Sequence, residues 1–197
     1  MIFFGTVRQW HWISSAVCLV GMLLFAITGI TLNHAAQITV KPRIDTIERQ
    51  LPEAILSKIT PPDADKAPLP LPLAQWLEKE LDIVVGTRSA EWSEDEIYLS
   101  LPRPGGDAWL TVDLVEGAVF FEKTDRGWIS YFNDLHKGRN TGTVWFWFID
   151  IFAVACVIFC ISGLILLYRH AGGRPTTWPL VGLGLVIPTI LALLFIH

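Results

Sequence analysis

Three long apolar runs, separated by polar residues, set the organisation of this chain. The runs are Ile13–Leu32, Thr143–Tyr168 and Trp178–Ile196, and nearly all of the charge lies between the first and the second. Each run reaches the ~18 apolar residues that suffice for a transmembrane helix. The pattern predicts an α-helical membrane protein: three transmembrane helices with a small α+β domain inserted between helices 1 and 2.

The changes in this pattern give the expected boundaries. They are transmembrane helix 1 (1–34), an extracytoplasmic domain (35–127), an amphipathic helix on the membrane surface (128–140), transmembrane helix 2 (141–171) and transmembrane helix 3 (176–197). Within the inserted domain, apolar residues at helical spacing predict a helix over Leu73–Leu81. The proline-rich run Ala67–Pro72 is interpreted as an extended linker.

Short runs rich in β-forming residues and bounded by turn residues predict strands in the rest of the insert. They are Thr87–Trp92, Glu96–Leu101, Ala108–Val112 and Ala118–Lys123. The expected insert is one helix on an antiparallel sheet.

Composition narrows the class of protein. The chain is 52% hydrophobic and 17% charged, with a net charge of −4. This excludes a simple soluble domain and gives no basic surface for nucleic acid. All three cysteines, Cys18, Cys156 and Cys160, fall in predicted membrane helices. We therefore expect packing residues rather than disulfides or a thiolate metal site.

Lys and Arg in the short loops predict the orientation. Arg8 lies before the first apolar run, and Arg169 and Arg174 lie between the second and third. These sides are expected to be cytoplasmic, which places residues 35–140 outside. Asp134, in the surface helix, is expected to be an exposed acid or a helix cap.

Four histidines flank the first two membrane runs. His11 and His34 precede and follow the first run, and His136 and His170 precede and follow the second. His11 and His34 are 23 residues apart, roughly 34 Å of helix, so they cannot share a ligand. In antiparallel helices, His11 and His170 share the cytoplasmic layer, and His34 and His136 share the outer layer.

Two imidazoles in each layer suit haem b held by two axial histidines, with one haem per leaflet. Two axial ligands saturate the iron, which favours electron transfer over substrate binding. The same positions also suit ordinary interfacial histidines. A bare metal ion competes less well, because zinc and copper sites usually need three or four ligands. The cations placed to meet haem propionates are Arg8, Arg169, Lys137 and Arg139.

Asp150 lies inside the second apolar run. An acid within a membrane helix marks a functional site by default. It can orient His34 through the free ring nitrogen, or it can bond to Ser, Thr or Asn33 of a neighbouring helix. Gly21 and Gly29 in the first run permit close approach of another helix or of a flat ligand.

Several segments resemble the PepSY-associated transmembrane family. They are Trp128-Ile-Ser-Tyr-Phe-Asn-Asp-Leu-His-Lys-Gly-Arg-Asn140, Trp147–Asp150 with Ser162–Leu166, the opening Arg8–Trp12 with Thr28–His34, and Glu96–Ser100 with Trp109–Gly117 of the insert. The resemblance covers essentially the whole chain. The Leu-His-Lys-Gly segment is its most specific part.

The resemblance implies a protein of the bacterial inner membrane whose insert is a PepSY-like domain. Larger relatives are haem-containing reductases of ferric siderophores, with haem ligands near the ends of the membrane helices. Those ligands map here onto His11, His34, His136 and His170. Unlike the larger relatives, this chain has three membrane runs and one insert, and it contains no Gly-x-Gly-x-x-Gly motif.

The resulting hypothesis is a b-haem oxidoreductase, as a homodimer, that passes electrons to a periplasmic ferric chelate. A quinol or a soluble reductase on the cytoplasmic side is the expected donor. The alternative hypothesis is a PepSY module that binds or inhibits a protein partner and uses the membrane helices only as an anchor. A third is an assembly subunit of a larger membrane complex.

Overall fold

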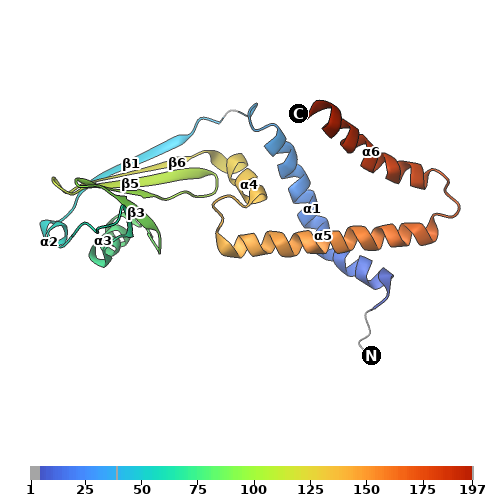
Figure 1. Cartoon of the computed structure of the whole chain (residues 1–197), viewed down its shortest axis with the longest axis horizontal. Coiled ribbons are helices and arrows are strands. Elements are labelled where there is room, and N and C mark those ends of the chain that lie inside the picture. The colour runs from blue at the N-terminus through green and yellow to red at the C-terminus, as the bar shows by residue number, and fades with distance from the viewer. Residues whose placement is uncertain (1–4, 39, 197) are drawn as a thin grey trace. The chain divides into compact units, whose positions relative to one another are not determined.

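The computed structural model of this chain describes residues 5–38 and 40–196. Three helices within these residues are long and apolar enough to cross a membrane: α1 (Val7–Asn33), α5 (Gly142–His170) and α6 (Thr177–Phe195) (Figure 1). The three predicted membrane helices are therefore confirmed as helices of sufficient length. Helix α1 begins at Val7, six residues before the apolar run, and so includes Arg8–Trp12.

An antiparallel sheet occupies the chain between α1 and α5. Over the described residues it has six strands in the order β1-β6-β5-β4-β3-β2. They are β1 (Arg43–Gln50), β2 (Lys66–Pro68), β3 (Ser89–Trp92), β4 (Glu96–Ser100), β5 (Gly106–Asp113) and β6 (Ala118–Asp125). The helices of this region are α2 (Glu53–Leu56), α3 (Leu71–Leu81) and α4 (Gly127–Lys137).

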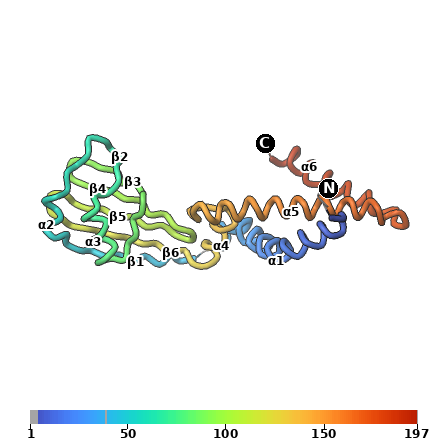
Figure 2. The backbone as a smooth tube through the Cα atoms, turned by 90° about the horizontal axis from the view of Figure 1, so that it is seen from below, coloured from blue at the N-terminus to red at the C-terminus, as the bar shows by residue number. Residues whose placement is uncertain are grey.

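Helix α3 covers one face of the sheet, and the core of the insert lies between them (Figures 1 and 2). In β5, every second residue is buried, as expected for a strand with one face on a core. Leu110 of β5 and Leu73 and Leu77 of α3 are all fully buried. The predicted arrangement of one helix on an antiparallel sheet is confirmed in outline.

Two features of the insert differ from the sequence prediction. The run Ala67–Pro72 is not a linker, because its start belongs to edge strand β2 and its end to the first turn of α3. Proline is tolerated at both places, since neither needs its missing N–H. Strand β1 was not predicted, because its apolar residues Ile44 and Ile47 do not alternate at the period of a strand.

The chain divides into two compact units. One unit contains residues 1–24 and 148–197, and the other contains residues 25–147. Helix α1 is shared between them. His11 and His170 belong to the first unit, and His34 and His136 belong to the second. Each predicted histidine pair therefore falls within one unit.

The buried face of α3 gives a direct test of the core. Leu77→Ala should lower the free energy of unfolding of the insert by roughly 2–5 kcal/mol, because it leaves a cavity in a fully buried site. Pulse proteolysis of the full-length protein in detergent, across a urea series, measures the loss. Leu71→Ala in the same helix is the matched control, since Leu71 is 68% exposed. Equal losses in the two variants would contradict the described packing.

Candidate functional site

The four predicted histidines fall into two structural kinds. His11 in α1 and His136 in α4 are half-buried, whereas His34, which follows α1, and His170, the last residue of α5, are exposed. The half-buried rings contact other helices. The exposed rings form hydrogen bonds to backbone carbonyls four residues earlier in the chain.

His11 lies against α5. Its Nδ1 is 3.1 Å from the hydroxyl oxygen of Ser162, and its ring stacks on Phe159 with centroids 4.9 Å apart. A Cβ built on Gly163 would lie 3.2 Å from Cε1 of His11. The ring therefore fits a slot formed by a hydroxyl, an aromatic face and a residue without a side chain.

His136 lies against the end of α1 in a similar way. Its Nδ1 is 2.7 Å from the hydroxyl oxygen of Thr28, and its ring is 4.9 Å from that of Phe25. About one turn later in α1 and one turn earlier in α4, the Thr31 hydroxyl donates to the side-chain oxygen of Asn133 at 2.7 Å. Two polar contacts spaced three residues apart thus join α4 to α1.

The exposed histidines are oriented by backbone carbonyls. Nδ1 of His34 is 3.0 Å from the carbonyl oxygen of Ile30, and Nδ1 of His170 is 2.8 Å from that of Leu166. A carbonyl can only accept, so Nδ1 carries the hydrogen in each ring. In the neutral ring, the lone pair is then on Nε2.

Nδ1 of His34 thus bonds to a carbonyl oxygen rather than to a carboxylate. Asp150 is exposed on α5. Its predicted role as the group that orients His34 stays a prediction. Among the described residues, no hydrogen bond or ring contact joins His11 to His170 or His34 to His136, so the pairing also stays a prediction.

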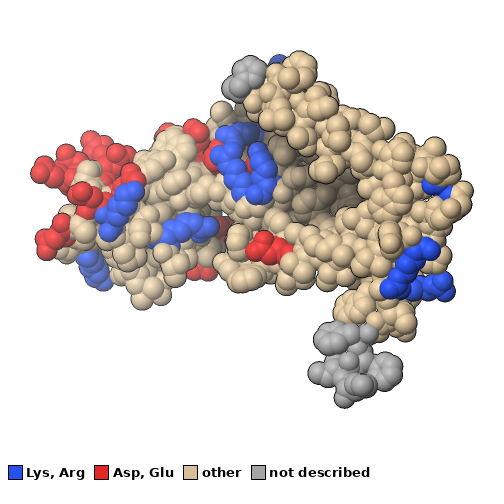
Figure 3. Space-filling view, turned by 45° about the vertical axis from the view of Figure 1, so that its right-hand side comes forward, with Lys and Arg blue, Asp and Glu red and all other residues tan. Residues whose placement is uncertain are grey.

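The glycines predicted to allow close approach are covered by side chains. A Cβ on Gly21 would overlap the ring of Phe152, and one on Gly29 would lie 3.6 Å from Cε1 of His136. The partner at each glycine is therefore an aromatic or imidazole ring. The four cations predicted to meet haem propionates, Arg8, Lys137, Arg139 and Arg169, are all exposed. The space-filling view shows how Lys and Arg side chains stand on the surface (Figure 3).

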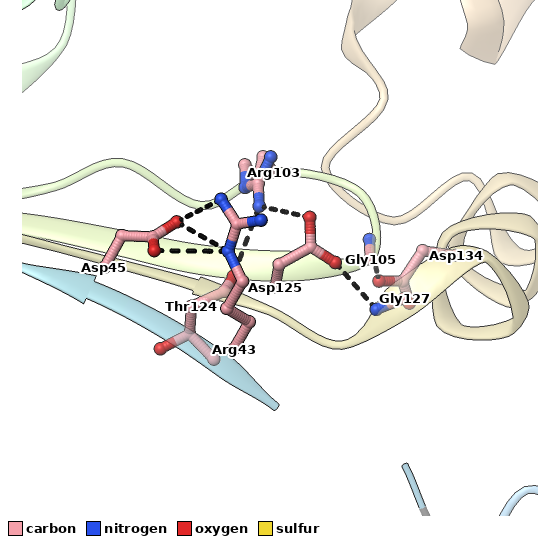
Figure 4. Close-up of polar contacts among 8 residues, drawn as sticks. All are labelled: Arg43, Asp45, Arg103, Gly105, Thr124, Asp125, Gly127 and Asp134. Atoms are coloured by element: carbon pink, nitrogen blue, oxygen red, sulfur yellow. Dashed lines mark hydrogen bonds and ion pairs between the residues drawn. The ribbon is translucent and has the colours of Figure 1, made fainter. Parts of the chain in front are cut away.

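Asp134 was predicted to be an exposed acid or cap, and this was wrong. It is 8% exposed, and it accepts a hydrogen bond of 2.9 Å from the backbone N–H of Gly105 (Figure 4). Gly105 has φ +71°, and a Cβ there would lie 2.8 Å from the backbone of Tyr131. The turn between β4 and β5 is therefore held closely against α4. No local sequence signal marks this contact, because the two residues are 29 positions apart.

A pocket of about 410 Å³ opens beside this contact. Its lining residues are Arg103, Pro104, Gly105, Asp125, Gly127, Trp128 and Tyr131. Arg103 donates to Asp125 at 3.1 Å, and the N–H of Gly127 donates to the other carboxylate oxygen at 2.7 Å (Figure 4). The N–H of Gly127, followed by the guanidinium of Arg103, lowers the pKa of Asp125 below its ordinary value. The carboxylate of Asp125 therefore keeps its charge to lower pH than usual, and its bond to Gly127 lies at the start of α4.

A bare zinc or copper ion would need three or four side-chain ligands close together. Among the described residues, no group of three or more His, Cys, Asp or Glu side chains is arranged to hold a metal ion.

The fold and the site define a membrane protein with three helices of spanning length, a sheet domain between the first two, and histidines at the ends of the helices. The family described as "Putative PepSY_TM-like" matches residues 2–197. The chain belongs to this family, which confirms the resemblance found in the sequence. No curated protein and no solved structure matches the chain.

The buried carboxylate on α4 generates a stability prediction. Asp134→Ala should destabilise the region by about 1–3 kcal/mol, because it leaves the buried N–H of Gly105 without an acceptor. Hydrogen exchange of the full-length protein should show faster exchange at Gly105. Asp95→Ala, at an exposed turn position, is the control and should change neither quantity. Unchanged exchange at Gly105 in the Asp134 variant would contradict the contact.

Proposed function

We propose that this protein is a b-haem electron-transfer protein of the bacterial inner membrane that delivers electrons to a ferric chelate outside. One observation carries the proposal: Nδ1 of every candidate histidine is in hydrogen-bond contact with an oxygen atom. In protein metal sites, a ligating histidine usually donates its other ring N–H in this way. The shared arrangement supports ligation through Nε2.

The donor set fits haem better than a bare ion. Two neutral imidazoles complete the axial coordination of a haem iron, whereas a tetrahedral ion needs more protein ligands. When bound, haem b supplies a one-electron couple between ferric and ferrous iron. Within the proposal, His11 with His170 and His34 with His136 hold one haem each.

The cations near these histidines have a supporting role in the proposal. Arg8 and Arg169 are close in sequence to His11 and His170, and Lys137 and Arg139 are close to His136. All four are exposed, so they remain available to pair with carboxylates such as haem propionates. By the loop charges, the pair His11 and His170 faces a cytoplasmic donor, a quinol or a soluble reductase.

A homodimer is part of the proposal. Asp150 is exposed on α5, although it lies within a helix of spanning length. Ionisable groups within membranes almost always face protein or water rather than lipid. This position of Asp150 supports a second copy of the chain as its partner.

A second candidate function is a PepSY-like module that binds a protein partner. The open face of the sheet carries a row of aromatic rings, in which Trp109 lies 6.3 Å from Tyr98 and 5.1 Å from Phe120 between ring centroids. Tyr98 is 38% exposed. Such a row favours contact with another surface. This reading requires no cofactor and predicts a colourless protein.

An optical spectrum separates the two functions. The purified protein should show a Soret band and, when reduced, a sharp α-band, because bis-histidine ligation gives low-spin haem. The spectrum is taken after expression with added haem precursor and again after addition of haem to the detergent-solubilised protein. Absence of both bands in both samples would refute the haem proposal and favour the binding module.

Histidine variants test the pairing. His11→Ala and His136→Ala should each remove one haem of two, measured as haem per chain by pyridine haemochrome. Adding His170→Ala to His11→Ala should cause no further loss, because both ligands serve the same haem. Adding His136→Ala to His11→Ala should remove the second haem. If neither single variant loses haem, the assigned ligands are wrong.

A further inference from the structure

Two membrane helices carry the same short sequence pattern. It reads Phe25-Ala-Ile-Thr28-Gly29 in α1 and Phe159-Cys-Ile-Ser162-Gly163 in α5. In each, a phenylalanine, a hydroxyl residue and a glycine occupy positions i, i+3 and i+4, which lie on one side of a helix. Each pattern receives one half-buried histidine, His136 on the first and His11 on the second.

The histidine ring makes the same three contacts in both places. It packs on the phenylalanine, it places Cε1 next to the glycine, and it places Nδ1 at the hydroxyl. The phenylalanine and the glycine define a slot for the ring. The hydroxyl is the group of the pattern that forms a hydrogen bond to the ring. It therefore decides which ring nitrogen carries the hydrogen.

Both hydroxyls also have a backbone carbonyl within hydrogen-bond distance. The hydroxyl of Ser162 donates to the carbonyl of Phe159 at 3.0 Å, and that of Thr28 donates to the carbonyl of Phe25 at 3.1 Å. A hydroxyl has one hydrogen but two acceptor lone pairs. With its hydrogen on the carbonyl, each oxygen accepts from the histidine. In that arrangement Nδ1 carries the hydrogen and Nε2 has the lone pair.

We infer that Ser162 and Thr28 are positioning residues that fix His11 and His136 in the Nδ1–H tautomer and present Nε2 as a ligand atom. This inference rests on the proposed function for its purpose, although the tautomer exists without haem. A hydrogen bond from Nδ1–H raises the basicity of the ligating nitrogen. Hydrogen bonds to a ligating histidine tune the reduction potential of a haem. A more basic ligand stabilises the ferric state and lowers that potential.

The first experiment measures the tautomer without haem. The full-length protein, labelled with ¹⁵N-histidine and produced in haem-deficient cells, is examined by NMR in micelles. His11 and His136 should show the Nδ1–H form. Ser162→Ala should shift His11 towards the Nε2–H form, and Thr28→Val should do the same to His136. Unchanged tautomers in the two variants would overturn the inference.

The second experiment measures the haems. Ser162→Ala and Thr28→Val should each weaken retention of one haem about 10- to 100-fold, as removal of a hydrogen-bond partner of a ligating histidine does at metal sites. Each should raise the midpoint potential of that haem only. Thr28→Ser should restore both values, because it keeps the hydroxyl.

Ser14→Ala is the matched control. Ser14 and Ser162 are both 5% exposed, but the hydroxyl of Ser14 donates to the carbonyl of Trp10 at 2.7 Å. Its removal should leave the potentials unchanged. Equal effects of Ser14→Ala and Ser162→Ala would show that the hydroxyls act only in packing, and would overturn the inference. A colourless wild-type protein with Nδ1–H histidines would instead refute the proposed function and leave the tautomer assignment standing.

Discussion

The arrangement of this protein depends on one constraint: a polar ring atom among apolar helices must find its hydrogen-bond partner within the chain. A donor or acceptor that is buried by packing and finds no partner costs about 1–3 kcal/mol. The hydroxyls of Ser162 and Thr28 meet this need for His11 and His136. The residue after the hydroxyl must be small where the ring packs closely. At Gly163, a Cβ would lie only 3.2 Å from the ring of His11. The position of the ring thus determines which small and polar residues the opposing helix needs.

Neighbouring residues of helix α4 contact two different parts of the protein, the sheet domain and helix α1. Asp134 accepts from Gly105 and holds α4 to the insert, while Asn133 and His136 bond to the threonines of α1. Asn133 and Asp134 are both buried. Tyr131 lines the pocket beside Arg103 and is less than two helical turns from His136. A displacement of the β4–β5 turn would therefore act on the same helix that carries the histidine. This gives the sheet domain a physical means to influence the histidine site, and it does not require a long chain of contacts.

Prediction from the sequence succeeded where one signal dominates and failed where tertiary contacts decide. The membrane helices followed from the length of the apolar runs, and the strands β3 to β6 followed from turn residues and alternation. The sequence did not predict the edge strands β1 and β2. Strand β1 buries too few residues to show an alternating pattern, and strand β2 ends in a proline. The histidines were found by their positions at the helix ends. Their partners were not, because Ser162 and Thr28 are 151 and 108 residues from the rings they bind. The burial of Asp134 was missed for the same reason.

The contacts of the histidines bear on whether the membrane helices bind a cofactor or only anchor the sheet domain. An anchor needs only apolar helices, and Phe or Leu would fill the slots of His11 and His136 without any polar contact. Polar groups buried in such a place are a cost unless each is satisfied. The chain satisfies Nδ1 in both slots and leaves Nε2 without a hydrogen bond to the described residues. In the exposed rings of His34 and His170, Nδ1 likewise forms a hydrogen bond, here to a backbone carbonyl. All four rings thus use Nδ1 for a contact to oxygen, two through side-chain hydroxyls and two through carbonyls of their own helix.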